Sequence, residues 1–297
     1  MSQARAAEVG AGPGRRARLR AARLYLVTDD HTPAAELPAL IAAAVAGGVE
    51  VVQLRRKLDP PSELVELARS CRQAAQAGGA LFLVNDHLEL AAAADADGVH
   101  LGQDDLDPEA ARVRLGAELL IGLSTHDSEQ LRRSQHQPVD YISAGPVRAT
   151  PSKPGREPVG LEYVSRAARS ASVPVVAIGG LGPGSAAAAI AAGADLIGVV
   201  RAICRAADPG AAAATLASEI DGASSWIWLE VNGALRKCPA KGTVAALLEG
   251  LEVDPSSVVV ERNGNIVKGL ALAQLRLEPG DQLEVVRFVG GGRGYGG

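Results

Sequence analysis

The sequence predicts an α/β chain made of a parallel (β/α)8 barrel, the TIM barrel, and a smaller α+β domain after it. Short β-branched runs alternate with Ala-rich helical stretches from residue 23 to about residue 220. Eight such runs occur, and eight parallel strands close into a barrel. Only 3% of residues are aromatic although 47% are hydrophobic. The core must therefore be built from Ala, Val, Leu and Ile, which suits a layered barrel interior.

The eight strands are expected where apolar and β-branched residues cluster, namely at Leu24–Thr28, Val49–Leu54, Leu81–Asn85, Gly98–Leu101, Leu120–Ser124, Tyr141–Ala144, Val173–Ile178 and Leu196–Val200. Helical stretches between them include Ala34–Ala46, Ser62–Ala77 and Ser185–Ala192. A doubly wound open sheet is the alternative arrangement. No GxGxxG motif follows the first strand, which counts against that alternative.

A second domain follows a change of pattern at Asp221–Ser225, where Gly, Ala and Ser replace the periodic apolar residues. Beyond it, Asn232-Gly233 supplies the positive φ angles of a type I′ turn. This turn predicts a hairpin of strands Trp226–Val231 and Ala234–Cys238.

One helix and two further strands complete the predicted second domain. Thr243 is the candidate N-cap of the helix, whose apolar face consists of Val244, Leu247, Leu248 and Leu251. Strands are expected at Val258–Arg262 and Gln282–Val289. The resulting ββαββ order predicts a ubiquitin-like β-grasp domain.

The two ends of the chain are expected to lie outside both domains. Several arginines near the N-terminus superficially resemble a transit peptide or a twin-arginine signal, but Leu24–Asp30 is too short and too soon charged for a signal peptide. The expected layout is a disordered Arg/Ala-rich leader at 1–20, the barrel at 21–220, a linker at 221–225, the β-grasp domain at 226–289 and a flexible Gly-rich tail at 290–297.

Charge and cysteine usage restrict the class of protein. The net charge is −4, so we expect neither a nucleic acid nor a membrane as partner. Cys71, Cys204 and Cys238 lie far apart and form no CxxC motif, which indicates reduced thiols in the cytoplasm. No apolar run reaches the roughly 18–20 residues of a membrane span.

Basic side chains follow the second predicted strand. Alternation places Gln53, Arg55 and Lys57 on one side, near the carboxyl end of the strand. Active sites of barrels lie at this end. A fork-shaped guanidinium beside a compact ammonium suits a multiply charged phosphate. A solvated basic loop is the competing interpretation, and Gln53 on the same side favours a site.

Carboxylates follow the third and fourth strands. Asp86 comes directly after one strand, and Asp104 and Asp105 come shortly after the next. Mg²⁺ prefers one or two carboxylates together with substrate phosphates, so Asp86 and Asp105 are the candidate ligands. The alternative is that Asp104 or Asp105 caps the helix before Pro108. The choice of Asp105 over Asp104 stays open.

Two later segments could bind anions. The loop after the sixth strand carries Thr150, Ser152 and Lys153 between prolines. The loops after the seventh and eighth strands, which hold Gly180 and Arg201, correspond to the recurrent phosphate site of this fold. His87, His100 and His126 lack metal spacing, so packed or hydrogen-bonded side chains are the simpler interpretation.

Residues 24–205 resemble thiamine-phosphate synthases throughout. Four motifs in order carry the resemblance: Val84-Asn85-Asp86-His87, Asp97-Gly98-Val99-His100-Leu101-Gly102-Gln103-Asp104-Asp105, Gly122-Leu123-Ser124-Thr125-His126, and Gly145-Pro146 through Lys153. The resemblance implies Mg²⁺ as cofactor at Asp86 and Asp105, and catalytic roles for Arg55, Lys57 and Lys153. The substrate-binding residues that it implies are Gln53, Leu54, Arg55, Arg56, Lys57, Asn85, Ser124, Thr150, Pro151, Ser152, Lys153, Gly180, Val200 and Arg201.

The implied reaction joins a 4-amino-pyrimidinylmethyl diphosphate to a thiazole phosphate, releasing diphosphate and forming thiamine phosphate. Such chemistry needs charge neutralisation and alignment rather than a strong general base. The sequence departs from the family at Arg148, where an aromatic residue is usual, at Arg201, where Ser is common, and at Ser152, where Thr is common.

Residues 226–292 resemble the sulfur carrier protein of thiamine biosynthesis. The matching features are Val231-Asn232-Gly233, Val260-Glu261-Arg262-Asn263, Gly280-Asp281 and Phe288-Val289-Gly290-Gly291-Gly292. The resemblance implies that the C-terminal glycine carries a thiocarboxylate. It also implies two partners, an adenylating or sulfur-transfer enzyme and a thiazole synthase. Gly297 is the expected terminus, with processing after Gly292 as the alternative.

Two rival functions remain at this point. A related thiazole tautomerase shares the barrel but not the diphosphate pocket, and the joint presence of Gln53, Arg55, Lys57 and Asp86 argues against it. The other rival makes the barrel a non-catalytic scaffold for the carrier domain.

Overall fold

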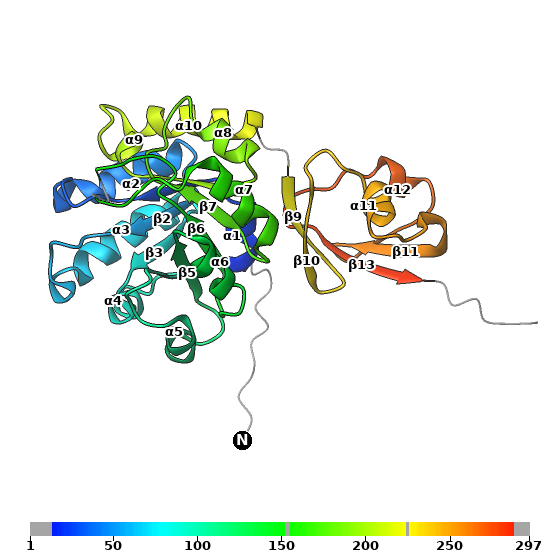
Figure 1. Cartoon of the computed structure of the whole chain (residues 1–297), viewed down its shortest axis with the longest axis horizontal. Coiled ribbons are helices and arrows are strands. Elements are labelled where there is room, and N and C mark those ends of the chain that lie inside the picture. Colours follow the sequence, from blue (N-terminus) through cyan, green and yellow to red (C-terminus); the bar gives the residue numbers. More distant parts are fainter. Residues whose placement is uncertain (1–13, 152–154, 224–225, 288–297) are drawn as a thin grey trace, which may run out of the picture. The chain divides into compact units, whose positions relative to one another are not determined.

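The computed structural model describes residues 14–151, 155–223 and 226–287. The chain divides into two compact units, residues 1–224 and 225–297 (Figure 1). Each unit has a hydrophobic core of its own.

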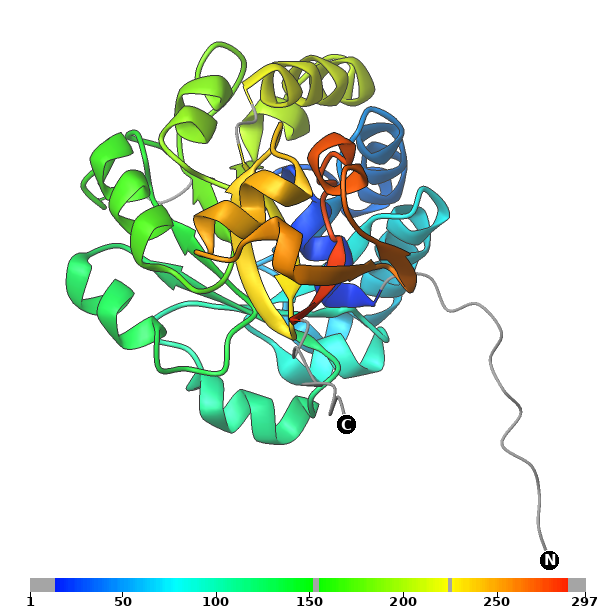
Figure 2. The same ribbon diagram turned by 90° about the vertical axis from the view of Figure 1, so that its right-hand side faces the viewer.

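The first unit is a closed barrel of eight parallel strands, each paired with the next, with β8 paired to β1. This confirms the predicted barrel and excludes the open sheet. The strands are β1 (Leu24–Val27), β2 (Val51–Leu54), β3 (Leu81–Asn85), β4 (Gly98–Leu101), β5 (Leu120–Thr125), β6 (Tyr141–Ala144), β7 (Val175–Ile178) and β8 (Leu196–Val199). Helices form a ring around the strands (Figure 2).

The helical segments of this unit are α1 (Arg15–Ala21), η1 (Ala34–Glu36), α2 (Leu37–Ala46), η2 (Pro61–Glu63), α3 (Val65–Ala77), α4 (Leu88–Ala93), α5 (Pro108–Leu115), α6 (Ser128–Ser134), α7 (Gly160–Ser170), α8 (Ala186–Ala191), α9 (Arg201–Cys204) and α10 (Pro209–Ala223). Between strands and helices lies one apolar layer, and a second cluster fills the barrel interior. Along β2, Val51 belongs to the interior and Val52 to the outer layer. The next two residues alternate likewise, so Gln53 faces inward and Leu54 outward.

The predicted disordered leader is wrong for its last residues, because helix α1 begins at Arg15. Arg15 Nε lies 2.8 Å from Asp97 Oδ1, and Arg16 Nε lies 2.6 Å from Asp140 Oδ1. Leu19 is buried within the interior cluster. Since Asp97 and Asp140 directly precede β4 and β6, α1 lies across the amino ends of the strands. Basic residues that resemble a targeting signal thus have structural partners.

The predicted linker is also too long at its start, because α10 continues to Ala223. Ile220 in its last turns is fully buried against the barrel. The helix can continue through the Gly and Ala residues that suggested a boundary because tertiary packing outweighs their weak helix propensity.

The second unit is a five-stranded sheet of order β10-β9-β13-β11-β12, and helices pack against one of its faces. Its elements are β9 (Trp226–Val231), β10 (Ala234–Pro239), α11 (Val244–Gly250), η3 (Pro255–Ser257), β11 (Val258–Arg262), β12 (Asn265–Val267), α12 (Ala271–Gln274) and β13 (Gln282–Arg287). Asn232 and Gly233 both have positive φ, as the hairpin prediction requires. Thr243 Oγ1 accepts a hydrogen bond from Ala246 N and caps α11.

Strand β12 was not predicted. Asn263 and Gly264 have positive φ and join β11 to β12, so the Asn-Gly signal used at the first hairpin was present here too. With three residues, β12 is too short to show apolar alternation. Residues 288–297, which include the end of the predicted last strand and the predicted tail, lie outside the described residues.

Candidate active site

A cavity of about 880 Å³ opens at the carboxyl ends of the barrel strands. Loops that follow all eight strands contribute to its lining, because a closed parallel barrel brings every carboxyl end to one rim. Most of the predicted site residues line it: Gln53, Arg55, Lys57, Asn85, Asp86, Asp105, Ser124, Thr150, Pro151, Gly180, Val200 and Arg201.

Two predicted residues, Leu54 and Arg56, do not line the cavity. Leu54 is buried in the outer apolar layer. Arg56 does not line the cavity either, because its Nε lies 2.5 Å from Asp59 Oδ2 and its NH1 2.8 Å from the Thr32 carbonyl. Both point away from the rim because alternate residues of an extended strand face opposite sides. Ser152 and Lys153 lie outside the described residues.

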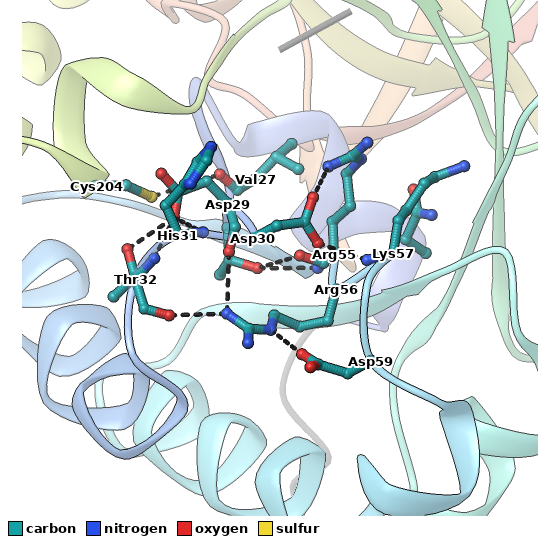
Figure 3. A network of polar contacts seen from close by, with 12 residues as sticks. Val27, Asp29, Asp30, His31, Thr32, Arg55, Arg56, Lys57, Asp59 and Cys204 are labelled. Atoms are coloured by element: carbon teal, nitrogen blue, oxygen red, sulfur yellow. Dashed lines mark hydrogen bonds and ion pairs between the residues drawn. The ribbon is translucent and has the colours of Figure 1, made fainter.

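The β1 loop supplies a carboxylate that the sequence analysis missed. Asp30 Oδ2 lies 2.8 Å from Arg55 NH1, and Asp30 Oδ1 accepts a 2.6 Å hydrogen bond from Lys57 N (Figure 3). Asp30 therefore holds both the guanidinium and the backbone of the basic segment. Its nearness to Arg55 could not be read from spacing alone, although its place just after the first strand was a usable signal.

Asp29 fastens the same loop to the rest of the barrel. Its carboxylate accepts hydrogen bonds from Thr32 N and Thr32 Oγ1, both at 2.8 Å (Figure 3). It also accepts one from Arg205 Nε at 2.9 Å. Burial acts to raise the pKa of Asp29, but these hydrogen bonds outweigh it and lower the pKa to about 2. The β1 loop is thus a fixed wall of the cavity.

The two candidate metal ligands face each other across neighbouring loops. Burial, together with the hydrogen bond and charge of Asp86, raises the pKa of Asp105. Lys57 Nζ lies 2.8 Å from Asp86 Oδ2. The capping alternative for this loop is wrong, because Asp107 is the N-cap of α5, and Asp105 Oδ2 instead accepts from Gly102 N at 2.6 Å.

The floor of the cavity is a set of buried polar side chains rather than an apolar plug. Gln53 bonds to Asn85 and to Tyr25, and Tyr25 bonds to Tyr141. His100 bonds to Tyr141 and to Ser124. The expectation that His100 is a hydrogen-bonded histidine agrees with these contacts. The two tyrosines were not predicted, because each lies within an apolar strand.

The opposite wall is made of backbone. Gly179 and Gly180 have positive φ, of 101° and 67°. A Cβ on Gly180 would lie 2.7 Å from Arg148 Cβ, so this close approach requires glycine. Arg148 and Arg201 both border the cavity here. The exposed backbone and two guanidinium groups make this wall suitable for an anion.

Comparison with known proteins decides the family. Residues 24–203 match the family model described as thiamine monophosphate synthase. The chain belongs to this family. The thiamine-phosphate synthase of Saccharopolyspora erythraea is 45% identical over 218 residues, which cover 70% of this chain and 97% of that protein. The solved structure of thiamine phosphate pyrophosphorylase from Pyrococcus furiosus is 33% identical with a TM-score of 0.63, covering 70% of this chain and 98% of that one.

Other members of the thiamine monophosphate synthase family are longer. The thiamine-phosphate synthase of Gloeobacter violaceus is 49% identical over 195 residues, 66% of this chain but only 56% of that protein. The second unit has a match of its own, because residues 229–292 fit the ThiS family model. Gly292 and Gly297 lie outside the described residues.

Among the residues that the structure describes, no helix combines the length and apolar character needed to cross a lipid bilayer. Within the same residues, no three His, Cys, Asp or Glu side chains gather as a metal site. A pair of carboxylates completed by substrate oxygens remains compatible with this finding.

Proposed function

We propose that the barrel condenses 4-amino-2-methyl-5-(diphosphooxymethyl)pyrimidine with a thiazole phosphate, carboxylated or not, to give thiamine phosphate and diphosphate. One observation carries this proposal: Arg55 and Lys57 face Asp86 and Asp105 within the same cavity. The family membership supports it, and so does the polar floor, which can hold an aminopyrimidine.

The residues present fit Mg²⁺. Burial and the neighbouring Asp86 carboxylate raise the pKa of Asp105 although Lys57 lies close by, which marks a place where negative charge is concentrated. Mg²⁺ binds through one or two carboxylates, with water and phosphate oxygens completing its octahedron. When bound, it would neutralise charge on the diphosphate oxygens.

The side chains of the cavity would assist the departure of diphosphate. The C–O bond to the pyrimidine methylene breaks, and its electron pair leaves with the diphosphate. Arg55, Lys57 and Lys153 neutralise the charge that develops on it. Gln53, Asn85 and Ser124 hold the pyrimidine, whose ring amino group stabilises the carbocation.

The thiazole nitrogen then forms the new C–N bond. The thiazole phosphate is held against the backbone wall by the residues that the family resemblance implies for it, namely Thr150, Pro151, Ser152, Gly180, Val200 and Arg201. The role of the protein in this step is alignment, which needs no general base.

Thiamine phosphate formation from both substrates tests the proposal. The purified chain should form the product with Mg²⁺ and stop when EDTA is added. A chain that isomerises a thiazole but does not couple it would be a tautomerase. A chain that does neither would make the barrel a scaffold, and either result would overturn the synthase proposal.

We also propose that the second unit is a sulfur carrier that acts through a thiocarboxylate on its terminal glycine. The ThiS-family match supports it. Its partners would be an adenylating or sulfur-transfer enzyme and a thiazole synthase. Intact mass after incubation with an activating enzyme, ATP and a sulfur source should show one oxygen replaced by sulfur, at Gly297 or, after processing, at Gly292. No change at either glycine would remove this role.

A cytoplasmic location is part of the same proposal. The three cysteines are free and buried, and burial raises the pKa of the Cys71 thiol to about 12. Thiols of this kind are unreactive and suit a reducing compartment.

A further inference from the structure

A continuous chain of hydrogen bonds crosses the floor of the cavity and joins six side chains, one from each of the strands β1 to β6. Gln53 Nε2 lies 2.7 Å from Asn85 Oδ1, and Tyr25 Oη lies 2.8 Å from Gln53 Oε1. The two tyrosine oxygens are 2.7 Å apart. His100 Nδ1 lies 2.9 Å from Tyr141 Oη, and His100 Nε2 lies 3.0 Å from Ser124 Oγ.

The inner members of this chain are shut off from solvent. Tyr25 is 2% exposed and Tyr141 0%. Burial raises the pKa of both phenols above the usual value, so both stay protonated. Each phenol then has one proton to donate, and every other bond that it makes must be accepted.

Because each phenol has only one proton to donate, the donor and acceptor of every hydrogen bond in the chain are fixed once the orientation of the Gln53 amide is fixed. If Gln53 Nε2 donates to Asn85 Oδ1, Gln53 Oε1 must accept the proton of Tyr25. Tyr25 has then no proton left, so Tyr141 must donate to Tyr25. The Tyr141 oxygen in turn has to accept from His100.

The direction then passes through the imidazole ring to the serine. His100 carries its proton on Nδ1, because it donates to Tyr141. Its Nε2 is then the unprotonated nitrogen and accepts, because a neutral imidazole is protonated at only one nitrogen. The Ser124 hydroxyl therefore donates to His100 Nε2 and keeps its oxygen lone pairs for the cavity.

Turning the Gln53 amide around would reverse every bond. Asn85 would then present its carbonyl oxygen to the cavity, and Ser124 would present a proton. Asn85 adjoins the basic and acidic groups of the diphosphate end of the cavity, where an anion requires donors. The reversed arrangement would place an acceptor against that anion.

We propose that Tyr25, Tyr141 and His100 are positioning residues that set this direction. They leave the N–H groups of Asn85 to donate at one end of the floor and the oxygen of Ser124 to accept at the other. This pattern selects a ligand with an anionic group near one end and an amino group at the other. The proposal rests on the proposed synthase function, whose pyrimidine diphosphate has both groups.

The protonation of His100 tests the direction without any assay of activity. In ¹⁵N-labelled protein, long-range ¹H–¹⁵N correlation distinguishes a ring protonated at Nδ1, at Nε2 or at both, and His100→Gln assigns the signal. A neutral ring protonated at Nδ1 at pH 7 is expected. A proton on Nε2, or on both nitrogens, overturns the proposal.

Tyr141→Phe tests the consequence for binding. Phenylalanine keeps the ring but removes both the donor to Tyr25 and the acceptor for His100. The expected result is a mixture of His100 tautomers and a KM for the pyrimidine diphosphate raised about tenfold, the usual effect of one misdirected buried hydrogen bond. The KM for the thiazole phosphate should change little.

Tyr163→Phe is the matched control, because Tyr163 is a buried tyrosine that bonds to the Asp127 carbonyl outside the cavity. It should leave the tautomer and both KM values unchanged. An unaltered His100 tautomer and pyrimidine KM in Tyr141→Phe would overturn the proposal. If wild-type protein makes no thiamine phosphate, the synthase function fails instead, while the tautomer measurement still decides the direction of the chain.

Discussion

Lys57 and Asp86 form an ion pair of 2.8 Å that closes the loop after β2 against the loop after β3. In the proposed function the first residue binds diphosphate and the second binds Mg²⁺. Because Lys57 and Asp86 neutralise each other, diphosphate and Mg²⁺ can each bind only when this ion pair is broken. Lys57 is half-exposed whereas Asp86 is mostly buried, so the lysine is the partner that can move.

Asp86→Asn should have opposite effects on two measurements. Thiamine phosphate formation with Mg²⁺ should fall by about tenfold to a hundredfold, since a metal ligand is lost. Binding of inorganic pyrophosphate in EDTA should become about two- to fivefold tighter, because Lys57 is released from an ion pair worth up to about 1 kcal/mol. Isothermal titration calorimetry measures the second effect, and weaker binding in EDTA would refute the competition. Asp95→Asn, which breaks a remote ion pair with Arg72, is the control.

Asp105→Asn and Asp104→Asn separate the two candidate ligands of one loop. Both side chains are exposed, but Asp105 lines the cavity beside Asp86, whereas Asp104 does not line it. Asp105→Asn should raise the Mg²⁺ concentration for half-maximal activity by about tenfold or more. Asp104→Asn should behave as wild type. Equal effects of the two substitutions would contradict the assignment.

Asp30→Asn should weaken the contacts that hold Arg55 and Lys57 in position. The amide loses the charge that pairs with Arg55 and accepts from Lys57 N through a weaker neutral acceptor. The KM for the pyrimidine diphosphate should rise by about tenfold in steady-state kinetics. Asp59→Asn alters the matching carboxylate that holds Arg56 on the outer side and should change nothing. If both variants keep the wild-type KM, Asp30 does not position the cations.

Acid should remove the stabilisation supplied by Asp29. Its folded pKa of about 2 lies below the ordinary 3.8, so the contribution is complete above pH 3.8 and is lost as the pH falls through 2. The substitution Asp29→Asn should lower the free energy of unfolding by up to about 2 kcal/mol near neutral pH. Urea unfolding from pH 2 to 6 measures the difference between variant and wild type. A difference that does not shrink at low pH would contradict the ion pair with Arg205.

Leu19→Ala should destabilise the barrel although it lies in the Arg-rich N-terminal segment. Leu19 is 1% exposed within the interior cluster, and removing such a side chain costs about 2–5 kcal/mol. Val113→Ala is the control, because Val113 is 85% exposed. A lowered urea midpoint only for Leu19→Ala is expected. Equal stability of the two variants would mean that α1 is not part of the folded barrel.

The candidate site could be predicted to the extent that it follows strand ends. Gln53, Arg55, Asp86 and Asp105 line one cavity because each lies at or just after an apolar strand, and a closed barrel brings those ends together. Alternation also explains why Leu54 and Arg56, which the family resemblance implies as binding residues, point outward and do not line the cavity.

By itself the sequence determined the order of the eight barrel strands, the first Asn-Gly hairpin and the rim at which the charged groups meet. All of these depend on residues close together in the chain, where period and turn chemistry act. Only the tertiary structure decided the helix α1, the carboxylate of Asp30 and the hydrogen-bonded floor. Tyr25 and Tyr141 are 116 positions apart, and Arg16 and Asp140 are 124 apart. Contacts between residues so far apart in the chain form only when the barrel closes, so a local sequence pattern cannot predict them.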